Sequence, residues 1–218
     1  HLKSAEDLVE MCRRENCFIL MPHPDTKAND GLPYLVKDED WFQDERWFGI
    51  GCRQLPADNS YRTMLDGRSS RVWNDINNWS CRPRYIISEL DTYSKVEETE
   101  ADWDIYGLNN VTYVKLDQLP KPDNWEELID ALREGNHFYS TGEILLENSE
   151  IEDGKAKATL SWTFPLSYAS VVYSDGKQAN ETEISLSDTK PFGKRNIEIT
   201  FPKGMKWARV LATDIAGN

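Results

Sequence analysis

The chain has 218 residues, of which 25 are Lys or Arg and 38 are Asp or Glu, so its formal net charge is −13. This length suits one large domain or two smaller ones. The acidic excess argues against nucleic acid as a partner, because phosphate binding requires clustered basic residues. No apolar run approaches the length of a membrane span. The chain starts without Met and shows no signal peptide, so we expect a mature product or a fragment of a longer protein.

The first predicted elements are a helix and a buried strand. Ser4 precedes apolar residues at helical spacing and has an acidic residue three positions later, which is typical of a helix N-cap. The apolar run 17–21 predicts a strand buried on both faces, and Pro22 ends it. Ligands gather at the carboxyl ends of parallel strands, which makes His23 and Asp25 candidate site residues. The alternative is that His23 only makes a hydrogen bond in a turn.

The next stretch of the chain alternates between predicted strands and a helix. Short strands are expected at 48–52 and 84–90, separated by an amphipathic helix at 70–80. The second strand ends in Asp91-Thr92-Tyr93, again a polar set at a carboxyl end. A further strand with alternating apolar residues is expected at 111–116.

The alternation of helices and strands continues to Glu143. A helix is expected after Asp123 or Asn124, with Gly135 as its stop signal, and it is followed by a strand at 137–140. Alternating α and β elements predict a mainly parallel sheet. We therefore expect residues 1–147 to form an α/β domain.

Residues 148–218 follow a different pattern. Apolar and polar residues alternate strictly, turn residues recur at regular spacing, and no helix is indicated. This pattern predicts a small all-β sandwich of the immunoglobulin-like type. The segment before it is apolar and not rich in Gly or Ser, so we expect the two domains to pack together. The predicted sandwich core consists of Trp162, Phe164, Ile184, Ile197, Ile199 and Trp207.

The four cysteines are Cys12, Cys17, Cys52 and Cys81, and none forms a C-x-x-C pair, which argues against a zinc knuckle. Cys12 lies on the first predicted helix and Cys17 begins the first predicted strand, so both resemble small apolar core residues. The pattern favours free thiols and leaves the redox compartment open.

Three segments together resemble one family, the PHP-type metal-dependent hydrolases, in the secreted branch that carries an appended β-sandwich. Met21-Pro22-His23-Pro24 is similar to a metal motif of this family in which a His ends a strand. Residues 130–143 resemble its closing helix and final barrel strand. Residues 206–218 resemble the last strand of its C-terminal domain. The resemblance implies that residues 1–147 are the C-terminal part of a β/α barrel with a mainly parallel sheet. The barrel would belong to a phosphoesterase-like hydrolase outside the cytoplasm, whose opening strands precede this chain.

The resemblance also implies a metal site, for zinc, manganese or iron, at which His23 and Asp91 are ligands and Asp25 is a further candidate. Two departures limit this site: the His-x-His motif of the family is absent, and Tyr93 stands where the family has a His. A catalytic zinc normally keeps three protein ligands. We therefore expect weak or absent metal binding and little activity in this chain without the preceding residues.

Further candidates for the chemistry of a hydrolase are Tyr93, Glu89 and Glu143, of which the two glutamates could equally be solvated strand ends. The substrate is open between a small molecule and a glycan. The competing hypothesis is a degenerate, non-catalytic binding protein, in which the sandwich is an adhesion or glycan-contacting module and the eight Trp and nine Tyr supply stacking surfaces.

Overall fold

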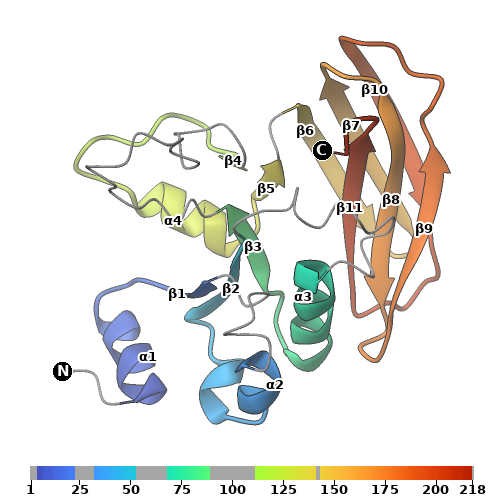
Figure 1. Ribbon diagram of the computed structural model, residues 1–218. Coiled ribbons are helices and arrows are strands. Elements are labelled where there is room, and N and C mark those ends of the chain that lie inside the picture. The colour runs from blue at the N-terminus through green and yellow to red at the C-terminus, as the bar shows by residue number, and fades with distance from the viewer. Residues whose placement is uncertain (1–3, 23–31, 53–67, 89–110, 141–142, 218) are drawn as a thin grey trace, which may run out of the picture.

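The computed structural model describes residues 4–22, 32–52, 68–88, 111–140 and 143–217. Figure 1 shows an α/β part, which ends with β5, beside a β-sandwich, which begins with β6. None of the described helices is both long and apolar enough to cross a membrane. The elements of the α/β part are α1 (Ala5–Arg14), β1 (Ile19–Pro22), α2 (Leu32–Val36), η1 (Asp40–Gln43), β2 (Trp47–Cys52), α3 (Arg68–Trp79), β3 (Tyr85–Ser88), β4 (Val111–Val114), α4 (Glu126–Arg133) and β5 (His137–Ser140).

Strands β1, β2 and β3 form a parallel sheet in which β2 is the middle strand. A core of buried side chains lies between this sheet, the 3-10 helix η1 and helix α3. Its largest members are Phe42 and Trp47, whose ring centroids are 4.3 Å apart. Helix α1 precedes the sheet and begins as expected, because the Ser4 side chain accepts a hydrogen bond from the Asp7 backbone.

The prediction of a β/α barrel with a mainly parallel sheet is wrong. The described residues are rich in β-strands, and they form one short parallel sheet and three small antiparallel sheets. Strand β5 runs antiparallel to β4 although α4 separates them along the chain. A helix between two strands leaves enough chain for the second strand to run parallel or antiparallel to the first. The alternation of helices and strands in the sequence therefore did not decide how the strands pair.

The C-terminal part consists of two three-stranded antiparallel sheets, with the orders β10-β7-β6 and β11-β8-β9. Side chains from both sheets meet in one hydrophobic core. The first strand of the sandwich starts at Ile144, so it crosses the predicted boundary between residues 147 and 148. The strands are β6 (Ile144–Glu152), β7 (Lys155–Trp162), β8 (Leu166–Ser174), β9 (Ala179–Ser185), β10 (Gly193–Thr200) and β11 (Trp207–Asp214).

The predicted core of the sandwich is confirmed for Trp162, Ile197 and Ile199, which are buried, and Ile184 packs against them. Phe164 was assigned wrongly, since 48% of it is exposed. It follows the last residue of β7, where the alternation of a strand no longer determines its direction.

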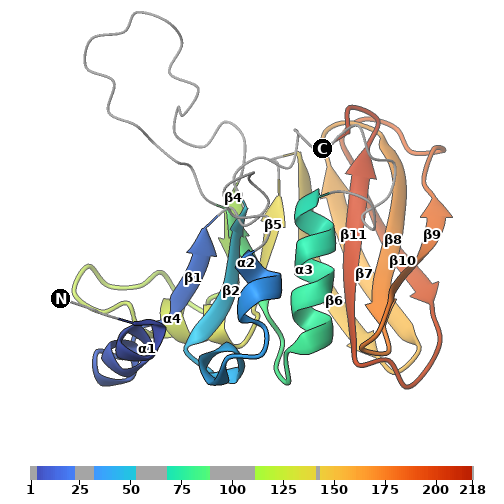
Figure 2. The same ribbon diagram turned by 60° about the horizontal axis from the view of Figure 1, so that its bottom comes forward.

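The two parts are in contact, as expected, and polar side chains take part in the contact. Figure 2 shows α3 lying alongside β11. The guanidinium of Arg209 on β11 stacks on the ring of Trp73, 4.0 Å from its centroid, and donates a hydrogen bond to Asn74. Trp207, predicted to be a core residue, points to α3 and donates a 2.9 Å hydrogen bond to Asn78 Oδ1.

Candidate functional site

Most site residues predicted from the sequence lie outside the described residues: His23, Asp25, Glu89, Asp91 and Tyr93. The three parallel strands end at Pro22, Cys52 and Ser88, immediately before three of the gaps. Strand β2 separates β1 from β3, so the strands that precede His23 and Asp91 are not neighbours. Because both strands end in polar residues, we also expect from the sequence that they are neighbours in one sheet, and this expectation is wrong.

Glu143 is the one predicted site residue that the structure describes, and it lies at the end of a pair of strands. Its backbone carbonyl accepts a 3.2 Å hydrogen bond from the Thr163 amide, and its carboxylate accepts another from the Thr163 hydroxyl. Glu143 thus joins the start of β6 to the end of β7. Across the described ranges, no three His, Cys, Asp or Glu side chains are grouped so that they could hold a metal ion.

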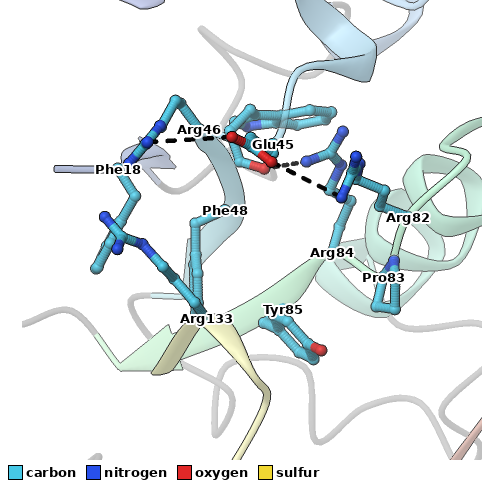
Figure 3. Close-up of a pocket in the computed structure, with 10 residues that line it drawn as sticks. Phe18, Glu45, Arg46, Phe48, Arg82, Pro83, Arg84, Tyr85 and Arg133 are labelled. Carbon is cyan, nitrogen blue, oxygen red and sulfur yellow. Dashed lines mark hydrogen bonds and ion pairs between the residues drawn. The ribbon is translucent and has the colours of Figure 1, made fainter. Parts of the chain in front are cut away.

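A pocket of about 310 Å³ lies at the opposite edge of the parallel sheet, where the strands begin (Figure 3). Its volume is in the range of sites for small molecules. The pocket brings together four arginines, one glutamate and several aromatic rings. Its lining consists of Phe18, Glu45, Arg46, Trp47, Phe48, Arg82, Pro83, Arg84, Tyr85 and Arg133.

Arg84 forms the buried base of this pocket. Only 2% of the residue is exposed, and its guanidinium stacks on Trp47, 4.6 Å from the ring centroid. It donates hydrogen bonds to the carbonyls of Phe42, Asp44 and Trp47, and its Nε donates to Ser80. Burial lowers the pKa of Arg84 to about 10, which leaves it charged at neutral pH. With all these donors occupied, Arg84 holds the sheet edge together and has little left for a ligand.

Arg46 and Arg82 are less occupied and both lie near the carboxylate of Glu45, as Figure 3 shows. The ion pairs are long, 4.0 Å for Arg46 and 3.9 Å for Arg82. Arg46 also donates a 3.2 Å hydrogen bond to Asn16 Oδ1, but its Nε is buried and has no partner. The two guanidinium groups therefore share a single exposed carboxylate.

Arg133 reaches the pocket from helix α4. One of its nitrogens is 3.3 Å from Asp130, and another donates a 2.9 Å hydrogen bond to the Asn16 carbonyl. It therefore ties α4 to the turn between α1 and β1. Arg133 contributes positive charge to the pocket while its position is fixed by protein contacts.

Aromatic rings form the apolar wall of the pocket. The rings of Phe18 and Phe48 stack with centroids 4.8 Å apart, and Tyr85 lies 5.4 Å from Phe48. Gly135, at φ +77°, allows this arrangement, because a Cβ there would lie 2.5 Å from the Tyr85 ring. The pocket thus combines cationic groups with flat apolar surface.

His137 extends the aromatic wall behind Phe48 and Tyr85, at centroid distances of 5.6 and 5.4 Å. Its Nε2 is 3.3 Å from the Ile86 carbonyl, so Nε2 carries the proton, and Nδ1 is buried without a partner. Burial lowers the pKa of His137, and the hydrogen bond to Ile86 opposes this effect only in part.

We expect the stability of the protein to fall as the pH drops below 6.5, in part because of His137. An unfolded His binds a proton near pH 6.5, whereas the folded side chain binds it only at lower pH. The unfolded state therefore gains protons first, and the stabilisation is present above 6.5 and lost below it. Urea unfolding from pH 7.5 to 5 should show a shallower decline for His137→Gln, which does not titrate. Parallel profiles for the two proteins would contradict this assignment.

Sequence analysis missed the pocket, although a signal was present. Glu45-Arg46 directly precedes β2, and Arg82-Pro83-Arg84 directly precedes β3. Parallel neighbours place their starts at one edge, so these basic residues had to converge. Comparisons with family models, curated proteins and solved structures find no match to this chain.

Proposed function

We propose that the chain binds a small organic anion, a carboxylate or phosphate ester with a flat apolar body, in the pocket at the start of the parallel strands. The observation that carries this proposal is the pairing of Arg46 and Arg82 with one exposed carboxylate at long distance. Guanidinium groups bind carboxylates and phosphates through paired hydrogen bonds. An incoming anion would accept shorter hydrogen bonds from these two guanidinium groups than the Glu45 carboxylate does.

The charge distribution supports the proposal. Residues 1–147 carry 16 basic and 29 acidic side chains, yet the pocket has four arginines and one glutamate. A concave site lined by positive charge focuses the electric field and raises the local concentration of small anions, even in a protein whose net charge is negative. The rings of Phe18, Phe48 and Tyr85 offer the apolar contact that an aromatic or heterocyclic body needs.

The experiment is a calorimetric titration with phenyl phosphate, with inorganic phosphate and benzyl alcohol as half-ligands. We expect saturable binding of phenyl phosphate that is tighter than that of either half and weaker at high salt. Arg46→Gln should raise the Kd at least about tenfold, which corresponds to roughly 1.4 kcal/mol.

The matched control is Arg195→Gln, because Arg195 is an exposed sandwich residue paired with Asp188 and its loss changes the net charge equally. This variant should bind like the unmodified chain. Equal losses in both variants, or no saturable binding at all, would refute the proposal.

A second candidate is the metal-dependent hydrolase that the PHP resemblance implies. It is favoured by the common direction of β1, β2 and β3, whose carboxyl ends lie at one edge and lead into the segments that contain His23 and Asp91. Metal analysis after dialysis tests it. One equivalent of zinc, manganese or iron that is lost in His23→Ala would support a metal centre, and a metal-free chain would argue against one here.

A further inference from the structure

We propose that Cys12 and Cys17 form a reactive dithiol site, which small disulfides convert to an internal disulfide bond. The inference rests on how helix α1 ends. The helix stops at Arg14, Glu15 is its C-cap, and Asn16 follows in the left-handed conformation with φ 51°. The Cys17 amide then donates a 3.0 Å hydrogen bond back to the Cys12 carbonyl.

This hydrogen bond is the hallmark of a Schellman motif, which a side-chain contact between its two residues frequently accompanies. That contact is commonly apolar, whereas this chain places two thiols at these positions. Burial, and to a smaller extent a hydrogen bond between the thiols of Cys12 and Cys17, raises the pKa of Cys12 to about 11. Neither cysteine is in a disulfide in this structure.

The different exposure of the two cysteines sets the order of the reaction. Cys12 is 2% exposed, while Cys17 is only partly buried. The Cys17 thiolate attacks one sulfur of a small disulfide, whose S–S bond breaks and releases one thiolate. The Cys12 thiol gives its proton to that thiolate, and its sulfur then attacks Sγ of Cys17. The mixed disulfide breaks and the second small group leaves as a thiolate, which takes up from solvent the proton that Cys17 had released. The two cysteines thus lose two electrons and the small disulfide becomes two thiols.

The position of the pair links it to the arginine pocket. Asn16, inside the loop that the bond would close, accepts hydrogen bonds from Arg46 at its side chain and from Arg133 at its carbonyl. Oxidation would fix the turn on which both arginines rest. The proposal for the dithiol itself does not depend on anion binding in the pocket.

The test uses the folded chain, oxidised glutathione and trypsin. Arg13 and Arg14 lie between the two cysteines, so trypsin separates them into the peptides 4–13 and 15–27. After incubation, acid quenching and alkylation of free thiols, we expect these peptides to be joined by a disulfide and to carry no glutathione. The exposed Cys81 is an internal control. The experiment uses a Cys52→Ser background, in which Cys12 and Cys17 are the other two cysteines of the sequence.

Cys81 should therefore retain a glutathione adduct in the same sample that shows the joined peptides. In Cys17→Ser the linkage should disappear, and the buried Cys12 should stay unmodified. Two results would overturn the proposal. In the first, the two peptides stay separate and Cys17 carries a stable glutathione adduct. In the second, Cys12 and Cys17 are both unreacted while Cys81 is modified.

Discussion

Replacing Arg84 with Met is expected to lower the free energy of unfolding by about 3 to 5 kcal/mol, the range for removing one partner of a buried charged contact. Methionine keeps much of the side-chain volume but has no donor. The carbonyls of Phe42, Asp44 and Trp47 would lose this partner, and that of Asp44 would keep its hydrogen bond from the Trp47 amide. Each buried carbonyl left without a partner costs about 1 to 3 kcal/mol.

Arg82→Met is the matched control, because Arg82 lies two positions earlier in the same segment and its side chain is 58% exposed. Its loss should change stability by less than about 0.5 kcal/mol, as for most surface substitutions. Denaturant unfolding followed by tryptophan fluorescence measures both variants. Similar stabilities for the two would mean that Arg84 does not support the sheet edge.

Replacing Arg209 with Ala is expected to uncouple the α/β part from the sandwich, at a cost of about 3 kcal/mol. The guanidinium stacks on both Trp73 and Trp207, and a desolvated cation–π contact contributes about 2 kcal/mol. Its hydrogen bond to Asn74 on α3 adds to this value. Burial lowers the pKa of Arg209 to about 9, so the group is still a cation at neutral pH.

The measurement for this variant is thermal unfolding followed by calorimetry. The unmodified chain should unfold in one cooperative transition, and Arg209→Ala should show two, since Trp73 and Asn74 of α3 would lose their contacts with Arg209 and the hydrogen bonds of Asn78 to Lys206 and Trp207 would remain. Arg195→Ala removes an exposed arginine from the same sandwich and should leave one transition. A single, barely shifted transition in Arg209→Ala would show that other contacts carry the coupling.

Local structure was predictable from the sequence because its causes are local. The Ser4 cap, the helix that became α3 and the alternation along β7 each depend on residues within a few positions of one another. Strand β7 buries Ala156, Ala158, Leu160 and Trp162, as its alternation requires. The same reasoning failed at Phe164, which lies in the bend directly after the strand.

The pairing of strands was not predictable, because it depends on contacts between distant residues. Nothing near Val111–Val114 indicates that this strand pairs antiparallel with His137–Ser140. Nothing near Ile19–Pro22 indicates that Trp47–Cys52 lies between it and Tyr85–Ser88. The mainly parallel sheet was inferred from the order of elements, and that order is compatible with several sheets.

The described pocket and the site predicted from the sequence lie at opposite edges of the sheet. Known α/β proteins favour the carboxyl edge, which led to His23 and Asp91, and these two residues lie outside the described ranges. The described pocket is built instead from residues that precede the strands, and Arg133 joins it from α4, far along the chain. The interface formed by Arg209 was equally hidden, since a basic residue in an alternating strand is usually a solvated one.

The most direct test of the anion-binding pocket is a crystal structure of the chain soaked with phenyl phosphate. The proposal predicts phosphate oxygens within hydrogen-bonding distance of Arg46 and Arg82, with Glu45 displaced and the phenyl ring against Phe48 or Tyr85. Phenyl phosphate bound at another place on the chain, with Glu45 still between the two arginines, would contradict it.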